Sequence, residues 1–528
     1  MYHTKIFCRP IPDREVLCIS PLCFFSGIMK NFTVIVILSL IGFNLQAITS
    51  FNQNCREAYE CILCLRFGKA EKIIDAEKSV HPDNTLPYLL ENYVNFLAYM
   101  ISEEEPYLSM MIDRRDERLQ RLSSGDIASP WFLYSQAEIF FQLGFARMKS
   151  GEYIGAGLDL NRAYRLLEDN QKKFPGFLPN QVRLGLLHSM FGAVPDKYRW
   201  AFNAFDIKGS VHSGLQELNL VLSSCFQDDT YSFLLPETVF ILSFVSLNMT
   251  ADKKDAHKLI SEFKKPALIW WMKQSPLLSF CLANLRLKTG SNDEAIVILT
   301  SITKDPGRFP FHYPDYILGV SKLNRLDKDA HLPLLSFVAK FKGSNYLRTA
   351  YERLAWYYYI QADIVKYNLY MDRIPLRGSS LTDSDKQALS NSRRKIDPNL
   401  DLLKARLLFD GGYYQRSMDM LKGFSHSSEF SVPELHLEYT YRMARVHDEW
   451  NRKEDAIKWY ELTIREGSNH KSWYAANACL HLGLIYENQG KFGLARKNYE
   501  KCLNLKFEEY HFSITQKAKA GLLRIKKR

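Results

Sequence analysis

The stretch LGLIYENQGKFGLARKNYEKCL, residues 482–503, decides the fold because it places small residues at fixed intervals inside an otherwise helical pattern. Gly483 is followed seven residues later by Gly490, then by Ala495 and Tyr499 at intervals of five and four. Glycine and asparagine tolerate the left-handed conformation that ends many helices. Gly490 therefore predicts a tight turn between two helices.

The residues around this turn predict how the two helices pack. We expect the small residues on either side to face each other, because a large side chain there would force the helix axes apart at a cost of about 1–3 kcal/mol. The bulky residue four positions after the second small residue lies on the same face, one turn along. It is expected to fill the space between one hairpin and the next.

The same spacing recurs along the chain, which predicts a repeat architecture. In the last three copies the second small residue falls at positions 417, 456 and 495, so these units are 39 residues apart. The matching sets are Gly144, Gly151, Ala156 and Leu160; Ala283, Gly290, Ala295 and Leu299; Ala405, Gly412, Ser417 and Leu421; Ala444, Asn451, Ala456 and Tyr460; and Gly483, Gly490, Ala495 and Tyr499.

These observations predict an all-α fold, a solenoid of antiparallel helix hairpins. The alternative, an ordinary helical bundle, gives no reason for small residues to recur in fixed columns. A solenoid must close its terminal apolar face. Residues 511–528 suit a capping helix, with Ile514, Ala518, Leu522 and Ile525 on one stripe.

The last unit resembles the tetratricopeptide repeat, through Leu482, Gly483, Tyr486, Gly490, Ala495 and Tyr499. In overall layout the chain is similar to uncharacterised exported tetratricopeptide proteins of bacteria with two membranes. The resemblance implies a TPR-like superhelix in which the first helix of each hairpin lines a concave groove for a partner's peptide or helix.

The chain divides by these patterns into seven regions. Pro175, Pro179 and Pro195 predict an irregular junction in the middle, with an apolar cluster that either packs on the solenoid or binds a ligand. The regions are 1–28, an expected misannotated or disordered extension; 29–47, a signal peptide; 51–170, N-terminal TPR-like repeats; 171–270, the proline-containing junction; 271–390, degenerate repeats; 391–510, C-terminal repeats; and 511–528, the capping helix.

The strongest targeting signal begins at Met29. Lys30 is followed by an apolar run from Phe32 to Phe43 and by the small residue Ala47, which is the layout of a secretory signal peptide. The run is short for a span, which needs about 20 residues. We expect export, to the periplasm in a bacterium with two membranes. An uncleaved inner-membrane anchor and an outer-membrane association are the alternatives, and the only membrane contact expected is this segment, if it is uncleaved.

Cysteines and charges offer little chemistry. Cys61 and Cys64 form one CxxC without a second pair, so no metal site is expected, although an isolated disulfide with Cys55 in reach stays open. The net charge of +11 over 528 residues is scattered, so we expect no nucleic-acid partner. No catalytic or nucleotide-binding motif is present, so we expect no enzyme and no cofactor.

The function predicted is that of a non-enzymatic scaffold or adaptor of the cell envelope with protein partners. The resemblance implies groove positions, of which aromatic and arginine residues are the favoured anchors. The candidates are Arg406, Phe409, Tyr441, Arg445, Asp448 and Asn488. A carrier of small molecules or glycans, with an apolar pocket near the proline-rich middle, is the alternative, and an enzyme is a third.

Overall fold

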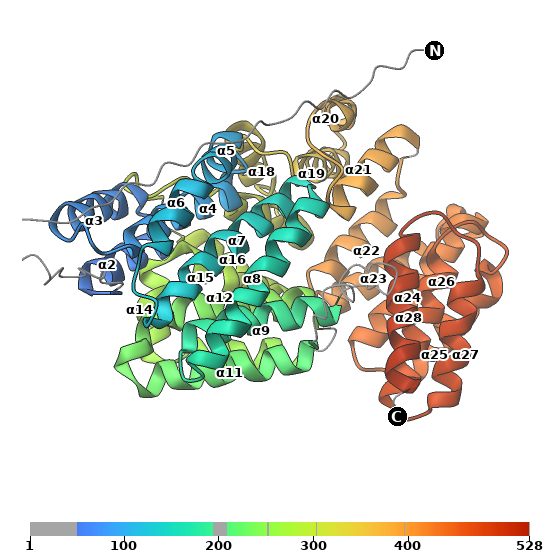
Figure 1. Cartoon of the computed structure of the whole chain (residues 1–528). Coiled ribbons are helices and arrows are strands. Elements are labelled where there is room, and N and C mark those ends of the chain that lie inside the picture. Colours follow the sequence, from blue (N-terminus) through green and yellow to red (C-terminus); the bar gives the residue numbers. More distant parts are fainter. Residues whose placement is uncertain (1–49, 194–208, 251–252, 303, 395–396, 527–528) are drawn as a thin grey trace, which may run out of the picture. The chain divides into compact units, whose positions relative to one another are not determined.

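The computed structural model describes residues 50–193, 209–250, 253–302, 304–394 and 397–526. The contacts between residues divide the chain into two units, residues 1–46 and residues 47–528. The first unit and the expected signal peptide, residues 29–47, lie outside the described ranges. The second unit is described below. Its described residues form helices and connecting loops without a strand (Figure 1).

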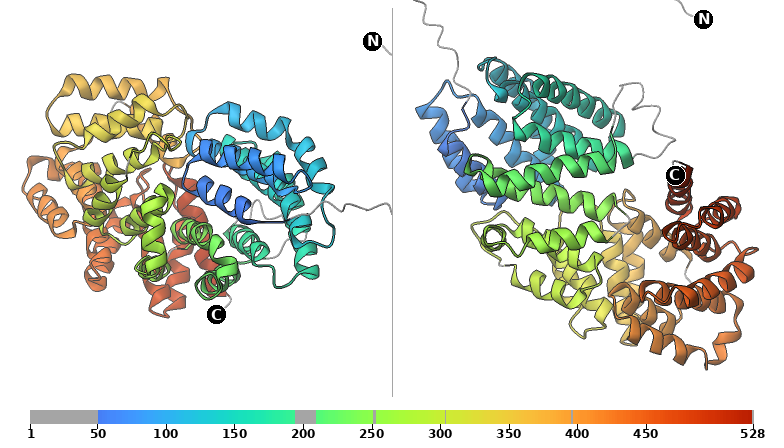
Figure 2. Two further views of the ribbon diagram at one scale, coloured as in Figure 1. Left: turned by 90° about the vertical axis from the view of Figure 1, so that its left-hand side faces the viewer. Right: turned by 90° about the horizontal axis from the view of Figure 1, so that it is seen from below.

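Helices that follow one another in the sequence pack side by side as hairpins, most extensively in the pairs α7/α8, α9/α11, α24/α25 and α26/α27 (Figures 1 and 2). The first half of the unit contains α2 (Gln53–Leu63), α3 (Phe67–Val80), α4 (Leu86–Ser102), α5 (Glu105–Asp113), α6 (Arg115–Ser123), α7 (Pro130–Ser150), α8 (Tyr153–Lys173), α9 (Leu178–Ala193), α11 (Val211–Gln227), the 3-10 helix η1 (Asp229–Leu234), α12 (Leu235–Asn248), α13 (Lys254–Glu262), α14 (Pro266–Gln274) and α15 (Pro276–Lys288).

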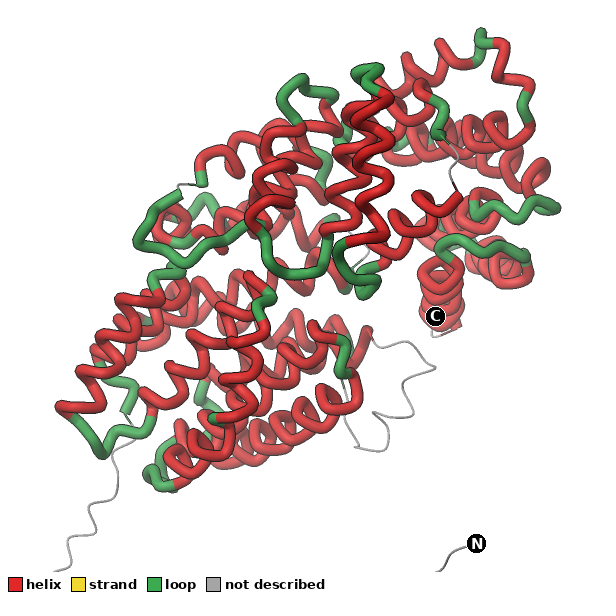
Figure 3. Tube along the Cα trace, turned by 90° about the horizontal axis from the view of Figure 1, so that it is seen from above, coloured by secondary structure: helices red, strands yellow, loops and turns green. Residues whose placement is uncertain are grey.

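The second half continues in the same way, with helices joined by loops (Figure 3). It contains α16 (Asn292–Ser301), α17 (Tyr313–Arg325), α18 (His331–Lys340), α19 (Leu347–Ile360), α20 (Ile364–Arg373), η2 (Ile374–Leu376), α21 (Asp383–Arg394), α22 (Leu400–Asp410), α23 (Tyr414–Phe424), η3 (Ser428–Ser431), α24 (Pro433–Glu449), α25 (Lys453–Gly467), α26 (Tyr474–Asn488), α27 (Phe492–Asn504) and α28 (His511–Lys526). The all-α solenoid of hairpins predicted from the sequence is confirmed.

The turn residues predicted from the repeat adopt the conformation that the argument requires. Gly151, Gly290, Gly412 and Gly490 have φ angles of 91°, 84°, 80° and 73°, and Asn451 has a φ of 60°. All five lie between the two helices of a hairpin. The column of Gly and Asn is therefore a column of left-handed turn residues.

The packing across each hairpin differs in one respect from the expectation. A Cβ on Gly144 would lie 2.7 Å from Leu160, and a Cβ on Gly483 would collide with the ring of Tyr499. The small residue before the turn thus makes room for the bulky residue of the same hairpin, which does not simply fill the space between hairpins. The two small columns also approach each other, since Ser417 Oγ donates a 2.8 Å hydrogen bond to the carbonyl of Ala405.

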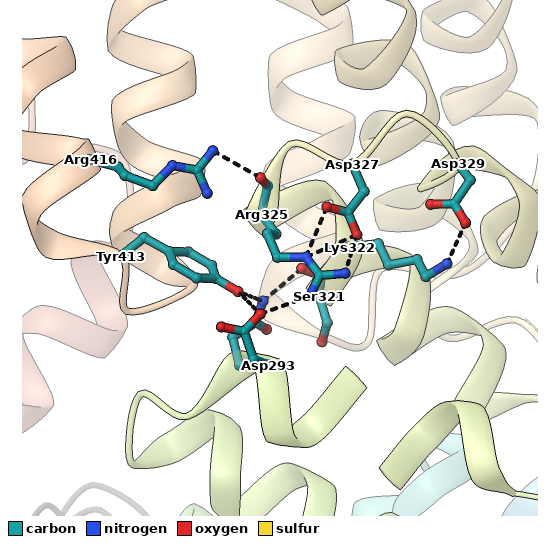
Figure 4. A network of polar contacts seen from close by, with 9 residues as sticks. Asp293, Ser321, Lys322, Arg325, Asp327, Asp329, Tyr413 and Arg416 are labelled. Carbon is teal, nitrogen blue, oxygen red and sulfur yellow. Dashed lines mark hydrogen bonds and ion pairs between the residues drawn. The ribbon is translucent and has the colours of Figure 1, made fainter. Parts of the chain in front are cut away.

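Two of these turns are far apart in the sequence but lie against each other, and their contact joins the two hairpins (Figure 4). Tyr413, beside the α22/α23 turn, donates a 2.8 Å hydrogen bond to Asp293 at the start of α16. Asp293 also accepts a 2.7 Å bond from Arg325 Nη1, which lowers the pKa of this carboxyl. A side chain at Gly412 would collide with the backbone of Gly290, so the glycines also permit this contact between turns.

The proline-containing region 171–270 was expected to be an irregular helical junction, and its described part consists of helices, including the 3-10 helix η1, joined by loops. Pro179 occupies the first turn of α9, where the missing N–H costs no hydrogen bond, so the proline begins a helix here. Leu187 and Phe191 are buried in the cluster that runs from Cys55 to Leu285, which favours packing over ligand binding for this part of the apolar set. Pro195 lies outside the described residues, as do three aromatic residues of the predicted apolar cluster, Trp200, Phe202 and Phe205.

Residues 229–248, which include α12, are long and apolar enough to cross a membrane, but 61% of this window is buried inside the structure. Leu242 and Val245 belong to the same core cluster. The burial fits a core helix.

The C-terminal helix α28 packs against α26 and α27. Ile514, Ala518 and Ile525 of the predicted stripe are buried. Arg524 adds a bidentate pair to the buried Glu487, with both N···O distances at 2.8 Å. The helix therefore covers the last repeat, as a capping helix does.

All seven cysteines of the described residues are free and buried, including Cys61 and Cys64. Burial raises the pKa of the Cys64 thiol to about 12, so it is not a reactive thiolate at neutral pH. The isolated disulfide left open above is absent among these residues.

Candidate binding site

Four of the six predicted site residues line one cavity of about 500 Å³, called here the Arg406 cavity. Arg406 and Phe409 come from α22, and Tyr441 and Arg445 come from α24. These are the first helices of two successive hairpins. The other lining residues are Trp356, Tyr367, Met371, Gln387, Asn391, Arg394, Asp397, Pro398, Asn399, Leu403, Asp410, Glu434, Leu435, Glu438, Arg442, Ser472, Trp473, Tyr474, Glu509 and Tyr510.

Helical spacing explains why α22 presents Arg406 and Phe409 to the cavity. Leu402 and Ala405 are buried against α23 and α24, and the pattern of burial leaves the neighbouring face open. Arg406 and Phe409 are three residues apart on that open face, so both side chains reach the same space.

Arg406 retains unused hydrogen-bond donors. Its guanidinium lies 4.9 Å from the ring centre of Trp356 and 3.8 Å from Asp410, a distance too long for a hydrogen bond. No hydrogen bond from this side chain to another described residue is present. Burial lowers the pKa of Arg406, but Tyr510 and Asp410 raise it by more. The net pKa lies above its usual value, so the side chain stays charged. A cation beside an aromatic face with free donors can bind a ligand that carries acceptor oxygens.

Arg445 is held more firmly and forms part of the wall. Its guanidinium carbon lies 5.2 Å from the ring centre of Phe409, Nη2 lies 3.3 Å from Glu449 Oε1, and Nη1 donates to His481 Nε2. Burial and the charge of Arg445 hold the pKa of His481 well below its usual value, so the imidazole is neutral and accepts this bond. Arg445 Nε is buried without a hydrogen bond to any described residue.

Tyr441 is a buried wall residue and not an exposed anchor. Only 5% of it is exposed, and its hydroxyl accepts a 2.7 Å hydrogen bond from Asn477 Nδ2. Its ring packs against Trp473 and Tyr474 at centre-to-centre distances of 5.1 and 5.3 Å. Its truncation would disturb the fold as well as the cavity.

The structure places the other two predicted residues outside this cavity. Asp448 is buried, accepts a 3.0 Å hydrogen bond from Tyr460 and pairs with Lys453 at 2.6 Å. Asn488 is exposed at the C-terminal end of α26 and does not line the cavity. Asp448 therefore serves the packing of the α24/α25 hairpin, and the cavity includes four of the six predicted residues.

Sequence reasoning missed much of the aromatic lining. Trp356 and Tyr367 come from α19 and α20, Tyr474 from the start of α26, and Tyr510 from the loop before α28. No single repeat contains these residues, so a repeat-by-repeat comparison does not bring them together. The only signal of this lining in the sequence was the abundance of aromatic residues.

Most other charges at the rim are already paired. Arg442 pairs with Glu438, and Arg394 pairs with Glu509. Asp397 accepts a 2.7 Å hydrogen bond from Tyr367. Arg406 is therefore the arginine of this lining that is least engaged by the protein's own groups.

No group of three or more His, Cys, Asp or Glu side chains within the described ranges is arranged to hold a metal ion. The chemistry available at the Arg406 cavity is thus that of aromatic surface, hydrogen-bond donors and charge.

Residues 476–509 match the family model of the tetratricopeptide repeat. The match covers α26 and α27, the hairpin that contains the stretch 482–503. No curated protein matches the chain. The chain therefore contains a tetratricopeptide repeat, which follows a series of other helical hairpins.

Proposed function

We propose that the protein is a non-enzymatic interaction module that binds a peptide segment of a protein partner in the Arg406 cavity. The tetratricopeptide repeat supports a role in protein–protein interaction. The observation that carries the proposal is the convergence of Arg406, Phe409, Tyr441 and Arg445, from two hairpins, on one cavity of about 500 Å³.

The test compares partners retained by the full chain and by the variant Arg406→Ala with Phe409→Ala. Both side chains are partly exposed and neither caps a helix, so the fold should survive their removal. The matched control is Lys458→Ala with Leu494→Ala, which removes an exposed cation and an exposed apolar side chain from second helices of the C-terminal hairpins. Defined partners should be lost with the first variant and retained with the control. Retention by both variants would overturn the proposal.

A second candidate is a carrier of small molecules or glycans. The volume and the aromatic lining of the Arg406 cavity favour it, since ligand pockets commonly span about 300–1,000 Å³. This cavity is not lined by residues of the proline-containing region 171–270, where the pocket was expected. A ligand that co-purifies with the full chain in native mass spectrometry and is lost with Arg406→Ala would favour the carrier; its absence alongside a retained partner would favour peptide binding.

We further propose that the protein acts in the cell envelope. The support is the layout of residues 29–47, with Lys30 before the apolar run and Ala47 after it. N-terminal sequencing of the protein from fractionated cells tests this proposal. A mature chain that begins after residue 47 in an exported fraction would support it, and a cytoplasmic chain that retains Met29 would contradict it.

A further inference from the structure

We propose that the outward face of α14 binds the surface of a membrane that contains anionic lipids. The proposal does not depend on the Arg406 cavity, whose lining contains no residue of α14. Figure 1 labels this helix in the first half of the unit.

The helix α14 has one face that packs into the core and one face that is exposed to solvent. Leu268 and Trp271 are buried in the core, with 0% and 6% of their surface exposed. On the opposite side Pro266, Ile269, Trp270 and Lys273 are all exposed, at the spacing i, i+3, i+4 and i+7 of one helix stripe. The surface presented to solvent is therefore apolar and aromatic over most of two turns.

Trp270 is the residue of this face that most strongly indicates a binding partner. It is 52% exposed, and it is the only exposed tryptophan among the described residues. Ile269 beside it is 41% exposed. Tryptophan is favoured at the boundary between hydrocarbon and headgroups, because its ring is largely apolar and its N–H can still donate a hydrogen bond.

Exposed lysines lie near this apolar stripe along the chain. Lys264 and Lys265 precede the helix, Lys273 lies in its last turn and Lys258 lies on α13, and all four are exposed. Of the nearby acids, Glu262 is already paired with Lys265 at 2.6 Å. The net charge of the patch is positive, which is complementary to an anionic lipid surface.

A second exposed apolar stripe shows what α14 has in addition. On α20, Val365 is 81% exposed and Leu369 is 45% exposed, but the stripe has no tryptophan. Its flanking Lys366 is paired with Asp363 at 2.9 Å. The combination of exposed tryptophan with several lysines therefore sets α14 apart and favours a lipid surface over a purely apolar partner.

The experiment measures flotation of the full chain with vesicles of phosphatidylcholine alone and of phosphatidylcholine mixed with phosphatidylglycerol. The quantity compared is the binding that appears only with the anionic vesicles and weakens with added salt. Binding to neutral vesicles, to which both the apolar run 32–43 and the apolar stripe of α14 contribute, is subtracted.

Three variants decide the outcome. Trp270→Ala with Ile269→Ser should reduce the anionic-specific binding by about tenfold or more, since it removes the apolar contact. Lys264→Gln with Lys273→Gln should reduce it by about fivefold for each lysine, given a contribution of about 1 kcal/mol per cation. The control Val365→Ser with Leu369→Ser should leave it unchanged. Circular dichroism checks that each variant remains helical.

Absence of anionic-specific binding in the wild-type chain would overturn the proposal, as would equal binding by all three variants. Capture of an acidic protein without any binding to anionic vesicles would overturn it as well, and would assign the patch to a protein partner. Loss of peptide binding at the Arg406 cavity would leave this result untouched.

Discussion

Two sets of buried polar contacts, one toward each end of the unit, hold helices together in different ways. In the C-terminal hairpins, a tyrosine of the second helix donates to a carboxylate twelve residues earlier, in the pairs Tyr460–Asp448 and Tyr499–Glu487. In the N-terminal half, Arg183 of α9 joins Glu138 of α7 and Glu237 of α12, 45 and 54 residues away. The first set of contacts lies within single hairpins, and the second set joins one hairpin to another.

The difference shows where the repeat argument applies. Contacts within a hairpin leave a regular pattern in the sequence, because both contacting residues recur at the same positions in each repeat. The buried ionic cluster around Arg183 leaves no such pattern, although Arg183 is among the largest fully buried side chains. Four predictions test this comparison.

The largest effect is expected for Arg183→Met. The substitution leaves Glu138 buried without its cation, with 0% of it exposed, and removes a partner of Glu237. We expect a loss of about 3–5 kcal/mol in the free energy of unfolding, measured by urea denaturation. The control Arg165→Met, at an exposed position of α8, should change it by less than about 0.5 kcal/mol.

Adding Glu138→Gln and Glu237→Gln to Arg183→Met should recover part of this loss, because no uncompensated charge then remains. If Arg183→Met alone costs no more than its exposed control, the cluster does not join the hairpins.

The second prediction concerns Glu103, which joins α4 to the loop before α19. Its carboxylate pairs with Lys149 at 3.0 Å and accepts hydrogen bonds from Tyr313 and from the backbone N–H groups of Ser344 and Asn345. Burial opposes ionisation, but Lys149 and these donors lower the pKa of Glu103 from 4.5 to about 2.

Because the pKa of Glu103 is lowered in the folded state, its stabilisation is complete above about pH 5 and is lost as the pH falls toward 2. The shift corresponds to about 3 kcal/mol. Denaturation of the wild type and of Glu103→Gln across this pH range should give curves that differ at pH 7 and converge near pH 2. Parallel curves would show that Glu103 does not contribute in this way.

The third prediction tests the small column of the hairpins. Gly483→Ala should lower the free energy of unfolding by about 1–3 kcal/mol, because the new methyl group collides with the ring of Tyr499. Gly493→Ala on α27 meets no atom within 4 Å and should be neutral or stabilising by up to about 1 kcal/mol. Equal effects at the two glycines would mean that close packing is not the reason for Gly483.

The smallest effect is expected at the turns. Gly490 has a φ of 73° and open space around it, so Gly490→Ala should cost about 1 kcal/mol through backbone strain alone. Asn451→Gly, at a φ of 60°, should stabilise by a few tenths of a kcal/mol for the same reason. Thermal unfolding of both variants measures the difference, and a stabilising Gly490→Ala would contradict the assignment of a left-handed turn.

The sequence predicted the hairpins well because their determinants are local. The glycines at 151, 290, 412 and 490 each report a turn without reference to the rest of the chain. The direction of packing at Gly483 was predicted less well, since the spacing alone does not say which side chain of the second helix fills the gap.

The candidate site was predicted only in part, for a related reason. Arg406 and Arg445 follow from the repeat, whereas Trp356 and Tyr510 reach the same cavity from elements that are 154 residues apart in the sequence. Asp448 shares its position within the repeat with Glu487, and in both units the carboxylate is held by a tyrosine. The resemblance predicts that this position faces the groove, but here its carboxylate accepts a structural hydrogen bond from a tyrosine of the same hairpin.

The central claim is that the Arg406 cavity holds a peptide. The most direct measurement is selection of peptides from a displayed library on the full chain, followed by fluorescence polarisation with the best binder. Arg406→Ala with Phe409→Ala should weaken binding by about tenfold or more, and Lys458→Ala with Leu494→Ala should not change it. A peptide bound equally by the wild type and by both variants would contradict the claim.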